Sequence, residues 1–359
     1  MHRTGIAQLP LHYGKVPPWL FERMTKMARE ITLIILDEFG PHEVLTRLSD
    51  PFWFQAFGCV LGFDWHSSGI TTTVCGALKE GLKGLERDTG LFVAGGKGKV
   101  SLRTPLEIET TAQAYPLKTD ARALIYASRM SAKVDNNALQ DGYTIYHHCF
   151  IFTEKGSWTV IQQGMNPETH FARRYHWLGS KVQDFVCEPH SGICCDYKGK
   201  VIDLVAKESI EARKNIALLS TQNPDKTIKE LERIQSLTLP REHHILVRDL
   251  DPKALRKILI STYERQPQDF KTLLGLPKVG PKTIRALALI SELIYGTPIS
   301  HKDPAKFSFA HGGKDGHPYP VDRKVYDRSI EILHKAISKA RVGDREKLSA
   351  LKRLSHFQV

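Results

Sequence analysis

A short run near residue 280 combines glycine, proline and lysine in a pattern suited to binding phosphate. The run is LLGLPKVGPKTIRALA at residues 273–288, and Gly280 with Pro281 marks the start of a helix. Proline is tolerated in a first helical turn because the amide that it lacks would have no partner there. The free amides and the helix dipole favour an anion at this point, which Lys278 and Lys282 flank. A phosphate held in this way is bound without any reading of base sequence.

The same run resembles the helix-hairpin-helix motif of DNA-repair proteins, whose core is Leu-Pro-Gly-Val-Gly-x-Lys-Thr. Lys278 stands where the motif has its first glycine, and the other core positions match. The resemblance implies a helix-hairpin-helix over 270–295 that contacts the backbone of double-stranded DNA. The DNA-binding residues that we expect here are Lys278, Val279, Gly280, Lys282, Thr283 and Arg285. The alternative is a packing element of two helices with a Gly-Pro turn and no ligand.

An aspartate further along the chain suggests a second kind of chemistry. Residues 320–326 are PVDRKVY, similar to the Val-Asp-Thr-His-Val run with the catalytic aspartate of base-excision glycosylases that carry a helix-hairpin-helix. The resemblance implies catalysis by Asp322, with Lys282 as the amine that the bifunctional members use. Aspartate is also a favoured N-cap residue, and a helix over 323–342 would begin there. We favour the cap over the catalyst.

Aspartates and histidines of the first 200 residues form another group with catalytic potential. A β-hairpin is expected at 143–165, and pairing of Thr153 with Trp158 would place His148 opposite Gln163. In one hypothesis, such side chains bind a divalent metal ion that activates water against a phosphodiester. The catalytic residues of that site would be Asp64, His66, Asp141, His147 and His148, with Glu188 and His190 as further candidate ligands.

A second hypothesis makes the same histidines hydrogen-bonded core residues. Consecutive side chains of a strand point to opposite faces, so His147 and His148 do not easily bind one ion. No carboxylate pair followed by Glu-x-Lys, a signature of nucleases, occurs in the chain. Both hypotheses remain open at the level of sequence, and the metal is not identified.

Glycine-rich segments supply further basic residues. The run GGKGK at 95–99 carries Lys97 and Lys99, which we include among the DNA-binding residues. It lacks the spacing of a P-loop, so no nucleotide hydrolysis is expected. A flexible basic turn without a ligand is the alternative. The Ser-Ser-Gly cap at 67–69 could hold phosphate, and Lys314 lies in a Gly-rich segment that also favours DNA contact.

The elements that must position these residues change character near residue 200. The earlier part has helical periodicity at 19–39, a helix predicted at 71–87, a short strand at 91–100 and the hairpin. The later candidates are all helical, at 204–218, 227–236, 252–263, 270–274, 281–295 and 322–342. We therefore expect an α+β domain with a small antiparallel sheet over 1–200, and an all-α DNA-binding domain over 201–359.

Charge and cysteine usage narrow the class of protein. The net charge is +12, and residues 201–359 hold 29 Lys and Arg against 19 Asp and Glu. Such a basic half favours a polyanionic partner. All six cysteines lie in the first 200 residues without a CxxC pair, which argues against a Cys-rich zinc site and fits a reducing compartment. We see no signal peptide and no long apolar run, so we expect a cytoplasmic protein without a membrane partner.

Several blocks together resemble one prokaryotic family that has no assigned reaction. They are LGFDWHSSG at 61–69, GGKGK at 95–99, DNNALQDG at 135–142, QQGMN at 162–166 and AHGGKDG at 310–316. The resemblance covers most of the chain and implies a cytoplasmic, often thermophilic, setting.

These observations support four functional hypotheses. The first is a DNA-processing or repair factor, nuclease-like, that binds DNA through residues 270–295 and uses a divalent metal ion in its N-terminal part. The second is a non-catalytic DNA-binding protein, which could be a homo-oligomer. The third is a DNA glycosylase or lyase that uses Asp322. The fourth, which we favour least, is RNA binding.

Overall fold

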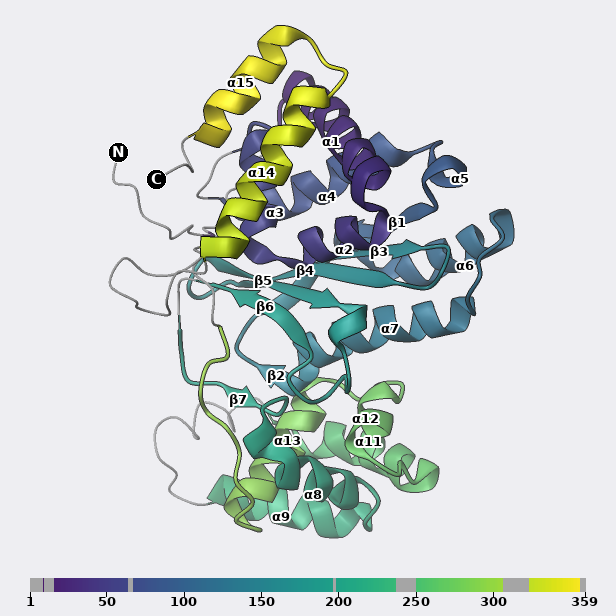
Figure 1. The fold of residues 1–359 in the computed structure, drawn as a ribbon. Helices are drawn as coiled ribbons and strands as arrows, with labels where there is room; N and C mark the ends of the chain where they lie inside the picture. The colour runs from purple at the N-terminus through teal and green to yellow at the C-terminus, as the bar shows by residue number, and fades with distance from the viewer. Residues whose placement is uncertain are drawn as a thin grey trace.

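The computed structural model describes residues 9, 16–63, 67–195, 198–236, 250–305 and 323–355 of the 359-residue chain. Its central feature is a five-stranded sheet in the order β1-β3-β4-β5-β6, and all neighbouring strands run antiparallel (Figure 1). The strands are β1 (Leu91–Lys97), β3 (Thr144–Thr153), β4 (Trp158–Asn166), β5 (Phe171–Leu178) and β6 (His190–Cys194). The antiparallel sheet predicted for the first 200 residues is confirmed.

One face of the sheet is covered by helices from both ends of the chain. Figure 1 shows the yellow α14 and α15 beside the purple α1, and α14 packs on α1 while α15 packs on α3. The strands contribute Cys149, Ile151 and Ile161 to this hydrophobic cluster. The helices of this layer are α1 (Pro18–Phe39), α2 (Pro41–Ser49), α3 (Pro51–Val60), α4 (Gly69–Leu82), α14 (Arg323–Lys339) and α15 (Asp344–Ser355), and the short α5 (Glu86–Thr89) precedes β1.

The opposite face is covered by α6 (Thr104–Ala114) and α7 (Ala121–Lys133), and a group of helices continues beyond α7 (Figure 1). This group contains α8 (Ile210–Ser220), α9 (Pro224–Ser236), α11 (Pro252–Arg265), α12 (Phe270–Gly275) and α13 (Pro281–Leu293). Its hydrophobic cluster is continuous with that of the sheet, from Phe150 through Met130 to Leu274. Short elements connect the layers: η1 (Gly98–Arg103), the π-helix η2 (Val134–Ala138), η3 (Gly179–Lys181), η4 (Lys207–Ser209), and the two-stranded pair β2 (Leu139–Gln140) and β7 (Ile202–Asp203).

The two hydrophobic clusters are divided by the sheet and not by residue 200. Residues 323–355 pack with the N-terminal helices, whereas α8 to α13 share a cluster with the sheet and α7. The change from strands to helices near residue 200 is confirmed as a feature of secondary structure. The predicted boundary between residues 200 and 201 does not separate two cores, because α14 buries its apolar side against α1.

The predicted register of the β3–β4 hairpin is wrong by one residue. Phe152 pairs with Trp158, so His148 lies opposite Gln162 and not opposite Gln163. The cause is the turn, in which the Thr153 amide donates to the Ser157 carbonyl oxygen at 2.9 Å and closes a three-residue loop. Gly156 has φ +90° within that loop, a conformation that favours glycine.

None of the helices among the described residues combines the length and the apolar character that crossing a bilayer requires.

Candidate functional site

The segment at 270–295 folds as two helices joined by a tight turn. Helix α12 ends at Gly275, residues 276–280 form what we call the connecting turn, and α13 begins at Pro281. Val279 is buried beneath the turn, which anchors it to the core. Lys278 is exposed, so the turn presents its positive charge to solvent. In α13, Thr283 is buried and Lys282 is exposed, so the two predicted contacts lie on different sides of the helix.

The backbone of the connecting turn assigns unexpected roles to its lysine and its glycine. Lys278 has φ +66°, in the left-handed region that glycine occupies without strain. Gly280 has φ −126° and ψ −176°, which any residue can adopt. Within the described residues, a Cβ added to Gly280 would meet nothing nearer than the Lys278 carbonyl oxygen at 4.0 Å. The fold therefore does not require glycine at position 280, and the start of α13 is open on that side.

Residues of the N-terminal half hold the connecting turn in place. The Lys133 ammonium donates to the carbonyl oxygens of Leu276 at 2.8 Å and Val279 at 3.1 Å. Lys133 is half-buried, and this burial lowers the pKa of its amine. A lysine of α7 thus binds two carbonyl groups that the tight turn leaves without helical partners.

The start of α13 is tied to the N-terminal half by a second pair of bonds. Gln140 donates to the Pro281 carbonyl oxygen at 2.8 Å and accepts from the Arg285 guanidinium at 2.7 Å. Arg285, predicted to bind DNA, is half-buried and is held by this internal bond. Sequence reasoning missed Lys133 and Gln140, since neither lies near the motif in the chain.

Asp141 forms part of a buried ion pair. Its carboxylate accepts from Arg173 at 3.0 Å, from the Tyr175 hydroxyl at 2.7 Å and from the Tyr143 amide at 3.1 Å, and its side chain is fully buried. Burial raises the pKa of Asp141, and the charge of Arg173 opposes that rise. Arg173 also pairs with Asp303 at 2.7 Å. These contacts give Asp141 a structural role at the end of the sheet, without access to solvent.

His148 lies on the face of the sheet that α7 covers, and both of its ring nitrogens are bonded. Nδ1 pairs with the Gln162 side-chain oxygen at 2.8 Å, and Nε2 pairs with the Ser128 hydroxyl at 2.9 Å. Burial lowers the pKa of this imidazole, so the ring is neutral. His148 therefore follows the second hypothesis for the histidines, in which they are satisfied core residues.

The centre of this network is Asp135, a residue absent from the predicted site. Its fully buried carboxylate accepts from the Gln162 amide, from the Trp177 indole at 2.9 Å and from His190 Nε2 at 2.5 Å. The available signal was the appearance of polar residues, such as Gln162, within otherwise apolar strands. The pairing of Asp135 with His190 joins residues 55 positions apart, so no local pattern contains it.

His147 lies on the other face of the sheet from His148, as strand alternation requires. Its ring is buried, and neither nitrogen has a hydrogen-bond partner among the described residues. Burial lowers the pKa of His147 to about 3, and the neighbouring His148 and Lys97 lower it further by smaller amounts. Asp64, His66, Lys314 and Asp322 lie outside the described residues. Within the described part of the chain, no group of three His, Cys, Asp or Glu side chains is arranged to hold a metal ion.

Comparison with protein-family models places this sequence in a family. Residues 5–321 match the family model described as "Protein of unknown function (DUF763)", and that match covers most of the chain. The chain belongs to the DUF763 family. The resemblance to a family without an assigned reaction is thereby confirmed. No curated protein and no solved structure matches this DUF763 chain.

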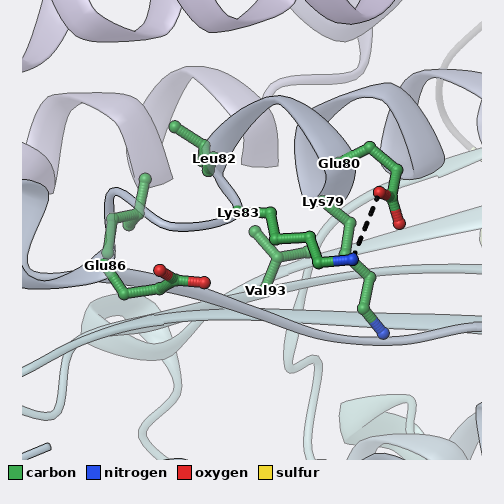
Figure 2. Close-up of a pocket in the computed structure, with 7 residues that line it drawn as sticks. Lys79, Glu80, Leu82, Lys83, Glu86 and Val93 are labelled. Atoms are coloured by element: carbon green, nitrogen blue, oxygen red, sulfur yellow. Dashed lines mark ion pairs between the residues drawn. The ribbon is translucent and has the colours of Figure 1, made fainter.

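A surface pocket of this DUF763 protein lies between the end of α4 and the start of β1 (Figure 2). Its volume is about 190 Å³, and Lys83 pairs with Glu80 at 3.9 Å on its wall. Ligand pockets for small molecules are usually larger, from about 300 Å³ upward. None of the predicted functional residues lines this pocket.

Proposed function

We propose that this protein binds the phosphate backbone of double-stranded DNA through a helix-hairpin-helix made of α12, the connecting turn and α13. The observation that carries the proposal is the glycine at position 280. Neither its backbone angles nor its described neighbours require glycine, because an added Cβ would make only an ordinary contact with the Lys278 carbonyl oxygen at 4.0 Å. A glycine that the fold does not need is explained by an external group that must approach the backbone closely. A phosphate at the N-terminus of α13 is such a group.

Charge around the turn supports an anionic ligand. Lys278 and Lys282 are exposed on either side of Gly280, and neither ammonium group forms an ion pair with another described residue. The first turn of α13 has no acidic residue that would compensate the helix dipole. Residues 201–359 carry most of the net charge of the chain. These features favour a polyanion bound by its backbone and give no basis for reading bases.

Rigidity of the turn also supports the proposal. Lys133 and Gln140 fix the carbonyl groups of the connecting turn and of Pro281 before any ligand arrives. A loop that is already ordered loses less conformational entropy when it binds. The proposal concerns binding, since the described residues supply no metal centre for phosphodiester hydrolysis.

The test is a salt titration of DNA affinity with single-lysine variants. Fluorescence anisotropy would measure the binding of a labelled duplex by the wild type, Lys278→Ala, Lys282→Ala and the control Lys253→Ala, which removes an exposed lysine of α11. Loss of one phosphate contact reduces the slope of log K against log salt by about 0.9. We expect this reduction and weaker binding for Lys278→Ala and Lys282→Ala, and wild-type behaviour for Lys253→Ala.

Two results would contradict the proposal. One is the absence of duplex binding at low salt, and the other is an equal effect of all three lysine substitutions. Single-stranded DNA, flap DNA and duplex RNA of the same length serve as competitors. Stronger competition by RNA than by DNA would indicate that RNA, and not DNA, is the partner. Incubation of the same DNA with and without magnesium, manganese or zinc would reveal cleavage.

A further inference from the structure

A buried imidazole that has no hydrogen-bond partner among the described residues marks a second candidate site. His147 is 1% exposed, and neither Nδ1 nor Nε2 has a hydrogen-bond partner within the part of the chain that the structure describes. Buried polar groups in folded proteins are nearly always bonded to protein or to an ordered molecule. His148, the next residue, meets that rule with two bonds. No residue in the described part of the chain supplies such a partner, so the exception at His147 leaves room for a ligand.

A β-bulge brings a tyrosine to the same side of the sheet as His147. The β3–β4 register shifts between Ile145 and His147, so Tyr146 is the extra residue. Gln163 lies directly opposite His147, and its amide donates to the Tyr146 hydroxyl at 2.5 Å. Since the hydroxyl oxygen accepts that bond, its own proton is free to donate elsewhere. Bulges often re-aim a side chain in this way beside functional sites.

A lysine completes the group from the other neighbouring strand. Lys97 is paired with His147 across the β1–β3 ladder, and its ammonium lies 6.0 Å from the centre of the Tyr146 ring. Lys97 is exposed, so a ligand can reach its ammonium group from solvent. The carboxylate of Glu107, which accepts from the Gly95 amide on β1, is already paired with Lys79.

The N-terminus of α4 adds to the positive character of this place. The Gln163 side chain accepts from the Thr71 hydroxyl at 2.5 Å and donates to the Ser68 carbonyl oxygen at 3.0 Å. Because Gln163 is the strand partner of His147, these bonds place the start of α4 near His147. Ser68 makes no capping bond with its side chain, and the first turn of α4 has no acidic residue. An ammonium group and the positive end of a helix dipole repel a cation and attract an anion.

We propose that Lys97, Tyr146 and His147 form a binding site for a phosphoryl group at the N-terminal end of α4. The lysine supplies charge, and the neutral imidazole and the phenol each supply one hydrogen-bond donor. The site lies on the sheet face covered by α4, whereas α7, which holds the connecting turn, covers the opposite face. It is therefore separate from the helix-hairpin-helix. The phosphoryl group could belong to free phosphate or to the end of a nucleic acid strand.

The first experiment measures the binding of inorganic phosphate to the full chain by isothermal titration calorimetry. The variants are Lys97→Ala, Tyr146→Phe and His147→Leu, and the control is Lys155→Ala, which removes an exposed lysine in the turn at the other end of β3. Loss of a hydrogen bond to a charged group weakens binding about tenfold or more. We expect that loss for the three site variants and unchanged affinity for Lys155→Ala.

The stability of His147→Leu keeps the test independent of folding. No hydrogen bond is lost in this variant, so its thermal midpoint should equal or exceed that of the wild type. Wild-type phosphate affinity in a folded His147→Leu variant would overturn the proposal. If that variant does not fold, unchanged affinity in both Lys97→Ala and Tyr146→Phe would overturn it equally. Absence of phosphate binding and of a preference for 5′-phosphorylated strands in the wild type would also do so.

A second experiment identifies the source of the phosphoryl group. Oligonucleotides with a 5′-phosphate and with a 5′-hydroxyl are compared in a protein carrying Lys278→Ala and Lys282→Ala, so that the proposed hairpin contacts are removed. A preference for the 5′-phosphate that His147→Leu abolishes would assign the site to strand ends. Equal binding of both oligonucleotides together with binding of inorganic phosphate would assign it to free phosphate. Either result can be interpreted even if the helix-hairpin-helix does not bind DNA, because this protein lacks both hairpin lysines.

Discussion

Replacement of Gly280 by alanine should separate the stability of the fold from the proposed binding of DNA. Two effects of similar size act on stability. Alanine is a poorer N-cap residue than glycine, which costs about 0.5–1 kcal/mol. Because φ −126° is accessible to alanine, the variant also restricts the unfolded chain, which stabilises the fold by about 0.4–1 kcal/mol. Among the described atoms, the added methyl has its nearest neighbour, the Lys278 carbonyl oxygen, at 4.0 Å, which adds no steric cost. We expect a free energy of unfolding within about 0.5 kcal/mol of the wild type.

The same methyl group should strongly weaken the proposed binding of DNA. It would stand on the open side of the α13 N-terminus, where the proposed phosphate must come within hydrogen-bond distance of backbone amides. Each hydrogen bond to a charged group contributes about 1.5–3 kcal/mol, so loss of one weakens binding roughly ten- to hundredfold. Gly280→Ala adds only a methyl group and leaves the charge unchanged, so any loss of binding would be a steric effect.

The assay pairs urea unfolding with equilibrium binding of a labelled duplex at fixed salt. Gly275→Ala is the matched control, because its methyl would meet only the Met130 sulfur at 4.0 Å, on the other side of the connecting turn. That control should keep wild-type affinity. If Gly280→Ala is as stable as the wild type and binds DNA equally well, the argument that glycine is present for a ligand is refuted.

Two further predictions concern the strained lysine and the buried imidazole. Lys278→Gly should raise the free energy of unfolding by about 0.5–1 kcal/mol, since φ +66° strains any residue with a Cβ. Urea unfolding checks this by comparison with Lys278→Ala, which loses the same charge. Equal stability of the two variants would contradict the prediction. The lowered pKa of His147 means that the unfolded chain binds more protons than the native one between about pH 3 and 6.5, so stability falls as pH falls through that range. Acidification from pH 7 to 5 should cost the wild type about 2 kcal/mol that His147→Leu does not lose, and an identical pH profile of both proteins would disprove the assignment.

Local signals in the chain predicted several elements closely. The helix expected at 19–39 is α1 (Pro18–Phe39), and Gly40 ends it with φ +80°. The Gly-Pro start of a helix at 281 is α13. Such features depend on caps, turns and side-chain periodicity within a few residues, so a short window of sequence contains the information. The strands of the hairpin were also predicted, but the predicted register was wrong by one residue, because it depended on the left-handed Gly156.

The candidate sites were only partly predictable, for a related reason. His147 and His148 were both candidates for one metal centre, yet they face opposite sides of the sheet and have opposite hydrogen-bond status. The pleat of a strand made it foreseeable that these two neighbouring histidines face opposite sides of the sheet. The identity of the partners was not, because Ser128 comes from α7, and Tyr146 shares the side of His147 through a bulge.

The sequence by itself determined the connecting turn, its lysines, the basic character of residues 201–359 and the presence of an antiparallel hairpin. The tertiary structure decided that Lys133 binds the carbonyl groups of that turn and that α14 packs on α1. It also decided that no described neighbour crowds position 280, so steric contact within the fold does not demand a glycine there. An amphipathic helix or a polar side chain shows that it needs a partner, but contacts between residues more than a hundred positions apart select which partner it has.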